Sequence, residues 1–340
     1  TPIKSSAASD VYKRQGYDIN KMANGVDAEY YAKLQADLSV PQWNMATQQK
    51  TAPGSTFKMV SATAAIEEGA VASIGETILC TGVFDKLAPT IHRCWIYPSA
   101  HGAMNLSNAI ANSCNSYFYE VGYRLSQDGT GYNSDYGLSR LKKYADLFGL
   151  TEKSGVEIME AEPEFSNLYA VPSYIGQGTH NYTTVGLARY VTTVANSGTC
   201  YNLSILDKLT DSKGNVIEDY TPEVRNTVDL DNSLWNAIHS GMRQVVEKKK
   251  YYDDLAVHVA GKTGTAQQDK TRANHALFVS YAPYEDPEIS VSVRIANGYS
   301  SDYAAQTARD VYKYYYGLAK EEELVTGTAD TLDATAGTGD

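Results

Sequence analysis

Apolar residues near the start of the chain follow a helical period directly after a break in regular structure. The segment Thr51–Gly54 reads Thr-Ala-Pro-Gly, and apolar residues then stand at positions 57, 59, 60, 62, 64, 65 and 66. This spacing predicts a helix, and Gly69 suits the position just after its end. Ser55 is therefore expected in or beside the first helical turn.

Three segments near the other end of the chain have the pattern of β-strands. Residues 255–260, 275–281 and 289–295 are rich in alternating apolar and β-branched residues, and a Pro/Asp/Glu-rich turn at 283–287 separates the last two. We expect an antiparallel meander of three strands. The tetrapeptide Lys262–Thr265, with the sequence Lys-Thr-Gly-Thr, should directly follow the first strand.

A second amphipathic pattern covers residues 138–148. Its apolar positions are Leu138, Leu141, Tyr144, Ala145 and Phe148. This segment contains Ser139-Arg-Leu-Lys142, with Lys142 and Lys143 expected on the solvated face of a helix. It repeats the Ser-x-x-Lys pattern of Ser55-Thr-Phe-Lys58, and we expect the second copy to be a surface feature without chemistry.

Three short motifs stand in a fixed order: Ser55-Thr-Phe-Lys58, Ser113-Cys-Asn115 and Lys262-Thr-Gly-Thr265. Together they offer a nucleophile, proton carriers and a cationic strand edge, which are the parts that acyl transfer needs. Ser-x-Asn alone is too common to carry meaning. The order and the structural context of the three motifs make the signal.

The structural context expected around Ser55 favours a catalytic role for this residue. Residues three apart share a helix face, so the Lys58 amine can reach the Ser55 hydroxyl. The helix N-terminus can stabilise an oxyanion, and Gly264 allows another backbone to approach the strand closely. The simpler alternative is that Ser55 only caps a helix, that Lys58 is a surface residue, and that Lys262–Thr265 is an ordinary exit from a strand.

From about Gly16 to Leu318 the chain resembles the transpeptidase domain of class B penicillin-binding proteins, of the elongation or sporulation type. The matching segments are Ala52–Lys58, Cys94–Trp95, His101–Gly102, Ser113–Phe118, Phe148–Leu150, Ile175–Gly178 and Ala195–Gly198. The resemblance implies an α/β (α+β) fold like that of serine β-lactamases. A central antiparallel sheet is flanked by helices, and an all-helical subdomain adjoins it.

The resemblance also implies a peptidoglycan D,D-transpeptidase that works through a Ser55 acyl-enzyme and needs no cofactor. The roles it implies are nucleophile for Ser55, base for Lys58, proton relay for Ser113, substrate positioning for Asn115, and carboxylate binding for Lys262, Thr263 and Thr265, next to Gly264. The substrate is a stem peptide ending in D-Ala-D-Ala. β-Lactams imitate that end and would acylate Ser55.

Three alternative functions stay open. A D,D-carboxypeptidase would use water as acceptor with the same residues, and a β-lactam sensor or a scaffold would need no turnover. A class A β-lactamase would need a glutamate in a Glu-x-x-Leu-Asn type of sequence, which this chain does not have.

Charge and hydropathy limit the partners. A formal net charge of −11, without a basic run, argues against nucleic acid. No stretch approaches the roughly 18 apolar residues of a membrane span.

The family acts at the extracytoplasmic face of a bacterial membrane, usually with an N-terminal anchor, a pedestal domain and a glycosyltransferase partner. The resemblance therefore implies that this chain is a fragment.

The two ends differ from the rest. Residues 1–15 do not fit what the family has there, and we expect that they replace a glycine-punctuated strand of the sheet. The transpeptidase domain is predicted at 16–318. The acidic segment 319–340, rich in Thr, Ala and Gly, is expected to be disordered.

Three of the four cysteines and one histidine form a second constellation. Cys80, Cys94, His101 and Cys114 fall within 35 residues, whereas Cys200 stands apart. Three thiolates and an imidazole can hold a structural zinc ion, a use of this loop that also has precedent in the family. A disulfide, Cys94–Cys114 or Cys80–Cys94, and free buried thiols are the alternatives. Either cross-link would tie the Ser113–Asn115 motif to this loop.

Overall fold

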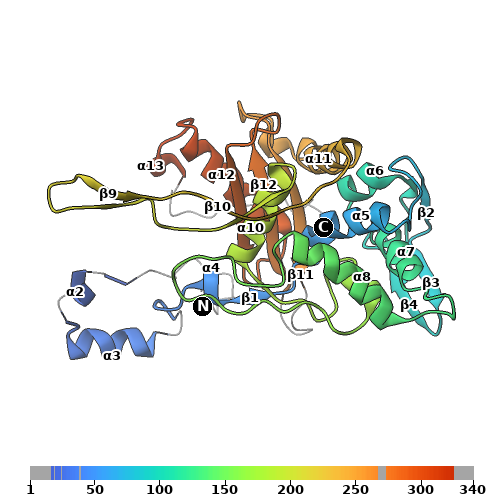
Figure 1. The fold of residues 1–340 in the computed structure, drawn as a ribbon, viewed down its shortest axis with the longest axis horizontal. Helices are drawn as coiled ribbons and strands as arrows, with labels where there is room; N and C mark the ends of the chain where they lie inside the picture. Colours follow the sequence, from blue (N-terminus) through green and yellow to red (C-terminus); the bar gives the residue numbers. More distant parts are fainter. Residues whose placement is uncertain (1–16, 19, 24, 38–39, 267–272, 325–340) are drawn as a thin grey trace, which may run out of the picture.

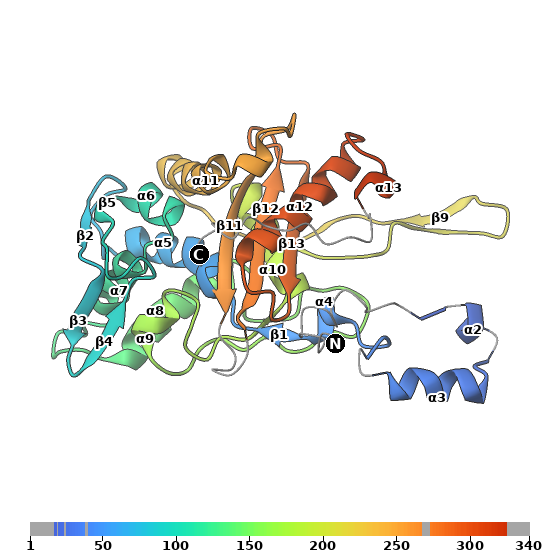
Figure 2. The same ribbon diagram turned by 180° about the vertical axis from the view of Figure 1, so that it is seen from behind.

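A three-stranded antiparallel sheet forms the centre of the protein (Figures 1 and 2). The computed structural model describes residues 17–18, 20–23, 25–37, 40–266 and 273–324. The strands are β11 (Ala260–Ala266), β12 (His275–Ala282) and β13 (Ile289–Ile295), in that order across the sheet. Helix α10 (Thr184–Ala195) covers one face and α12 (Ser301–Tyr315) the other. Every residue of β12 is therefore buried.

The predicted meander is confirmed for its last two strands, but the first strand was placed too early. Residues 255–259 form a loop that buries Leu255 and Val259 in the core cluster that also contains Tyr252, which explains their apolar pattern. The strand itself pairs with β12 from Ala260 opposite Tyr281 to the end of β11. The Lys-Thr-Gly-Thr sequence therefore lies inside an edge strand and not after one.

The helix predicted behind Ser55 is present. A 3₁₀ turn, η1 (Gly54–Phe57), leads directly into α5 (Lys58–Glu67), and Gly69 follows with a φ of +69°. This confirms Ser55 in the first turn. Eight of the ten α5 residues are buried, from Lys58 to Ala65, so Lys58 lies in the interior and not on the surface.

Helices on one side of the sheet form the predicted subdomain, which is not all-helical. Its helices are α6 (Leu106–Ala111), α7 (Asn115–Leu125), α8 (Ser134–Leu147) and α9 (Ala170–Ser173). Two small antiparallel sheets join them, β2 (Ile78–Cys80) with β5 (Gly102–Met104), and β3 (Val83–Leu87) with β4 (Thr90–Arg93). Ser139 lies exposed on α8 while Leu138 and Leu141 are buried, as predicted for the second Ser-x-x-Lys copy.

Helix α11 (Asn232–Glu247) connects the two parts, because it packs against both α6 and β11. The remaining elements are α2 (Asn20–Ala23), α3 (Ala28–Ala36), α4 (Met45–Gln48), β1 (Lys50–Thr51), β6 (Tyr182–Thr183), β7 (Thr199–Asn202), β8 (Lys208–Thr210), β9 (Val216–Asp219), β10 (Glu223–Thr227), η2 (Lys250–Tyr252) and α13 (Glu321–Leu324).

The predictions for the two chain ends concern residues that lie largely outside the described part of the structure. Residues 1–15 and 325–340 are not described, and within the predicted acidic tail residues 321–324 form the short helix α13. Within the described part of the chain, no helix combines the length and apolar character needed to cross a membrane.

Candidate active site

The hydroxyl group of Ser113 lies between two buried amines. Its Oγ is 3.0 Å from Lys58 Nζ and 2.9 Å from Lys262 Nζ. Lys58 Nζ also donates to the Ser113 carbonyl at 2.8 Å and to Asn115 Oδ1 at 2.7 Å. Ser55 lies one turn before Lys58 and is almost fully buried. The structure thus brings all five predicted catalytic residues, from three distant segments, to one place.

Ser113 occupies an unusual backbone conformation. Helix α6 ends at Ala111, and the N–H groups of Ser113 and Cys114 donate back to the carbonyls of Ile110 and Ala109. These bonds close a Schellman turn, in which one residue takes a left-handed conformation. That residue is Ser113, with a φ of +49°. Glycine is the usual residue here, so the serine costs on the order of 1 kcal/mol of strain.

Strand β11 and the Ser55 turn are packed backbone to backbone. A Cβ atom on Gly264 would lie 2.9 Å from the Pro53 carbonyl oxygen, and one on Gly54 would lie 2.4 Å from the Thr265 carbonyl oxygen. The close approach predicted for Gly264 is therefore present. It places Thr263 and Thr265 along the strand edge beside η1, opposite the edge that pairs with β12.

A buried histidine supports the other side of the Ser55 turn. The ring of His180 lies 4.6 Å from the ring of Phe57, the last residue of η1. Burial lowers the pKa of His180 to about 3, so the ring is neutral. Its Nδ1 accepts hydrogen bonds from the Ser166 N–H and the Tyr182 hydroxyl, at 3.1 and 2.9 Å.

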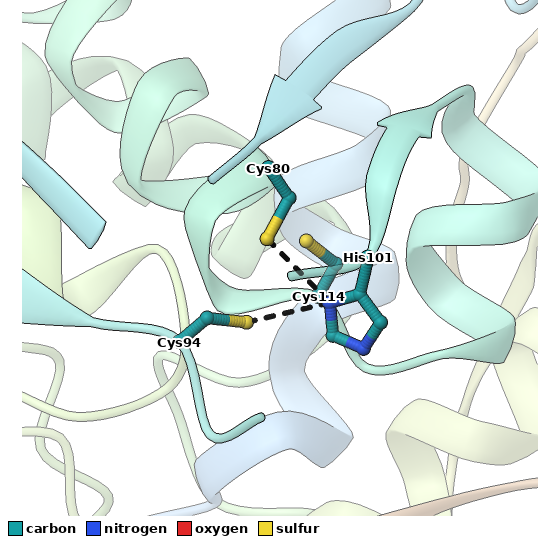
Figure 3. Close-up of side chains that lie close together, drawn as sticks. All are labelled: Cys80, Cys94, His101 and Cys114. Atoms are coloured by element: carbon teal, nitrogen blue, oxygen red, sulfur yellow. Dashed lines mark hydrogen bonds between the residues drawn. The ribbon is translucent and has the colours of Figure 1, made fainter. Parts of the chain in front are cut away.

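The predicted cysteine–histidine constellation is a compact cluster (Figure 3). The donor atoms of Cys80, Cys94, His101 and Cys114 all lie within 4.8 Å of one another. His101 Nδ1 is 3.6 Å from Cys80 Sγ and 3.5 Å from Cys94 Sγ. All four cysteines are free thiols in the structure, including the separate Cys200, so neither predicted disulfide is formed.

Two nitrogen–sulfur distances in the cluster match those of a zinc site. Zinc–nitrogen and zinc–sulfur bonds of about 2.1 and 2.3 Å, at a tetrahedral angle, place the two ligand atoms about 3.6 Å apart. The thiols of Cys94 and Cys114 also differ in their pKa values. A hydrogen bond from the Cys114 thiol lowers the pKa of Cys94, and the same bond and burial raise the pKa of Cys114.

Residues 4–313 match the family model of the penicillin binding protein transpeptidase domain. The chain belongs to this family. The peptidoglycan D,D-transpeptidase MrdA of Haemophilus influenzae is 28% identical over 92% of this chain and 51% of its own length. This transpeptidase domain thus spans about half the length of the curated relatives it matches.

Solved structures agree with the fold of this penicillin-binding protein domain. Penicillin-binding protein 2 of Pseudomonas aeruginosa, in complex with WCK 5153, has a TM-score of 0.78 at 24% identity, covering 93% of this chain and 77% of that one. A chain from a peptidoglycan synthase complex has a TM-score of 0.75 at 26% identity, covering 87% of this chain and 51% of that one.

Two contacts of this transpeptidase domain were not predicted. Gln177 donates its side-chain amide to the Thr265 carbonyl at 3.2 Å, and the neighbouring Gly176 carbonyl accepts from Gly54 N–H at 3.0 Å. Both residues belong to the matched segment Ile175–Gly178, but no chemistry could be assigned to it from the sequence. Asn112, which directly precedes Ser113, belongs to no motif and was also missed.

Proposed function

We propose that this domain is a peptidoglycan D,D-transpeptidase that forms an acyl-enzyme at Ser55. The observation that carries the proposal is the Ser113 hydroxyl, held 3.0 and 2.9 Å from the amines of Lys58 and Lys262. Lys58 in turn lies one helical turn after Ser55. A hydroxyl group can donate one hydrogen bond and accept two, so it can pass a proton between groups on either side.

In the first step the uncharged amine of Lys58 takes the proton of Ser55. Oγ attacks the carbonyl carbon of the penultimate D-alanine, and a C–O bond forms. Ser113 then gives its proton to the nitrogen of the last D-alanine and receives from Lys58 the proton that came from Ser55. The C–N bond breaks, and free D-alanine leaves. Asn115, whose Oδ1 accepts a hydrogen bond from Lys58, would orient the substrate amide.

The oxyanion of the tetrahedral intermediate would be held by the backbone N–H groups of Ser55 and Thr265. Ser55 lies in a first helical turn, where N–H groups have no partner within the helix. The Thr265 carbonyl faces Gly54 and Gln177, away from β12, and the N–H of a strand residue points to the same side as its carbonyl.

The substrate would lie along the edge of β11 that does not pair with β12, because an extended peptide can add to a sheet edge. Lys262, Thr263 and Thr265 offer a cation and two hydroxyl groups to its terminal carboxylate, and Gly264 keeps the edge against η1. An amine from a neighbouring stem peptide then attacks the acyl-enzyme. As the new amide C–N bond forms, the amine gives a proton to Lys58. The C–O bond to Ser55 then breaks, and Lys58 passes that proton to Ser55 Oγ. None of these steps requires a cofactor.

The proposed setting is the extracytoplasmic face of a bacterial membrane, with a glycosyltransferase as partner. The relative in a peptidoglycan synthase complex supports such an assembly. The net charge of −11 supports the expectation that nucleic acid is not a partner.

Labelling with a fluorescent penicillin tests the acyl-enzyme. We expect covalent labelling of the 340-residue chain at Ser55, none in Ser55→Ala, and unchanged labelling in Ser139→Ala, the matched Ser-x-x-Lys control. Labelling that persists in Ser55→Ala would contradict the proposal. A melting curve of each variant separates loss of chemistry from loss of fold.

The acceptor distinguishes transpeptidation from carboxypeptidation. A stem-peptide analogue ending in D-Ala-D-Ala should give a cross-linked amide when a stem-peptide amine is added. Release of D-alanine with water as the only acceptor, whatever the amine concentration, would instead identify a D,D-carboxypeptidase.

We further propose that Cys80, Cys94, His101 and Cys114 hold a structural zinc ion. The donor set, the burial and the nitrogen–sulfur distances support this assignment over a disulfide. A closed set of four protein ligands leaves no open position for catalysis. The ion would therefore stabilise the loops around Ser113 and take no part in acyl transfer.

A further inference from the structure

Asn112 is held by two side chains that are distant in the sequence. Its carbonyl oxygen accepts a hydrogen bond from the Trp95 indole N–H at 3.0 Å. Its side-chain oxygen accepts one from Lys248 Nζ at 2.8 Å, and the same amine donates to the Ala111 carbonyl at 3.2 Å. The Asn112 amide in turn donates to the Asn108 carbonyl at 2.9 Å. Its side-chain and carbonyl oxygens and its amide NH₂ therefore all have partners.

These tethers come from the elements that surround the active site. Trp95 follows the cluster residue Cys94, and its ring packs edge-on against His101, with 5.4 Å between ring centroids. Lys248 is the cap residue of α11, the helix that packs on both α6 and β11. The residue before Ser113 is thus connected to the cysteine–histidine cluster on one side and to the helix beside the Lys262 strand on the other.

An equivalent turn at the end of α10 has no hydrogen bonds of this kind to distant side chains in the part of the chain that the structure describes. Helix α10 also ends in an asparagine, Asn196, followed by a left-handed serine, Ser197. Among the described residues, the side chain of Asn196 bonds only to Gly198 and Thr199, within its own turn. A Schellman turn of this sequence therefore forms with local bonds alone, so the contacts of Trp95 and Lys248 are not needed to build it.

We propose that Asn112 is a positioning residue, and that Trp95 and Lys248 act through it to hold the Ser113 hydroxyl between Lys58 and Lys262. This inference rests on the proposed function. A left-handed serine relaxes easily when its neighbours allow it, because its conformation is strained. A proton relay is sensitive to such relaxation, since a displacement of about 1 Å can lower a rate about a hundredfold.

The rate of acylation by a fluorescent penicillin, measured over a range of concentrations, tests this proposal. The limiting rate constant measures the chemical step in the bound complex, which depends on the alignment of the catalytic groups. The half-saturating concentration measures how tightly the penicillin binds before that step. We expect Asn112→Ala to lower the limiting rate constant by about ten- to a hundredfold, with the half-saturating concentration changed less than about twofold. Asn196→Ala, the matched control, should acylate like the wild type.

Lys248 gives a second test that does not depend on the folding of Asn112→Ala. Lys248→Met keeps the apolar stem and removes the donor, and it should slow the limiting rate severalfold. Lys248→Arg keeps a donor and should restore most of that rate. Melting temperatures of Asn112→Ala and Asn196→Ala are expected to fall by similar amounts, so that stability does not account for the difference in rate.

The outcomes are distinct. The proposal is overturned if Asn112→Ala or, should that variant not fold, Lys248→Met acylates as fast as the wild type. It is also overturned if only the half-saturating concentration changes, or if Asn196→Ala slows acylation equally. A wild-type chain that folds but is not labelled at Ser55 overturns the proposed function and this inference together, and is recognised before any variant is compared.

Discussion

The ends of α6 and α10 are the same turn with different surroundings. In each, the N–H of an asparagine, Asn112 or Asn196, donates to the carbonyl four residues earlier, and that of the following serine to the carbonyl three residues earlier. The next N–H, of Cys114 or Gly198, donates to the carbonyl five residues earlier. The two serines have φ values of +49° and +57°.

Their side chains have different environments. Ser113 is 2% exposed and lies between two lysines, whereas Ser197 is exposed to solvent. The comparison teaches that Asn-Ser at a helix end produces the turn by local hydrogen bonds. Whether the serine can move a proton depends on what the rest of the fold brings to it.

Two other helices make this turn with glycine. Helices α8 and α12 end with the same three hydrogen bonds, and Gly149 and Gly317 take the left-handed position with φ values of +73° and +65°. Glycine adopts this conformation without the steric cost of a side chain. Glycine would therefore be the less strained residue at position 113. The serine found there is consistent with a role for its hydroxyl group and not with a gain in stability.

Removing each hydroxyl group is the strongest test of the comparison. Ser113→Ala should lower the rate of Ser55 acylation by about a hundredfold or more, because a positioned proton carrier contributes about 10²- to 10⁴-fold. Ser197→Ala should leave the rate unchanged. Equal rates for both variants, measured with a fluorescent penicillin, would show that the two serines are equivalent and would remove Ser113 from the proposed relay.

The residue after each serine gives the second test, because Cys114 belongs to the metal-ligand cluster and Gly198 does not. We expect one zinc ion per chain by elemental analysis, and its loss in Cys114→Ser. Cys200→Ser, which alters a buried free thiol outside the cluster, should retain the ion. A ligand that binds only the folded state adds about 4 kcal/mol at a thousandfold excess over its Kd, so a chelator should lower the melting temperature.

A chain that contains no zinc, and whose melting temperature is the same with and without chelator, would contradict the metal assignment. Thiol titration of the denatured, unreduced protein then distinguishes the alternatives. Four reactive thiols would indicate free cysteines, and two would indicate a disulfide.

Substitution of each serine by glycine is expected to have the smallest effect. Ser197→Gly should raise the free energy of unfolding by up to about 1 kcal/mol, because the steric strain is removed. Ser113→Gly should gain less, since it also removes the hydrogen bonds of two buried lysines. Denaturant unfolding measures both. A larger gain at position 113 than at position 197 would mean that these hydrogen bonds do not stabilise the fold.

Much of the site could be predicted because its local signals are strong. The Pro-Gly break and the apolar period behind Ser55 identified α5 and its C-terminal Gly69, and the cysteine and histidine residue types identified the cluster. Strand β11 was misplaced because Leu255 and Val259 are buried in a loop, and alternation alone does not distinguish a loop that packs on the core from a strand.

Short-range patterns in the sequence determined the helix behind Ser55, the glycine that follows it, the residue types of the motifs and the resemblance to the family. These features depend on backbone conformation and hydrophobic period, which act over a few residues. The ordered motifs also predicted that Ser113 joins Lys58 and Lys262. Only the tertiary structure decided which side chains hold the turn that carries Ser113. Contacts such as Lys248 with Asn112, 136 residues apart, arise from packing and leave no local pattern.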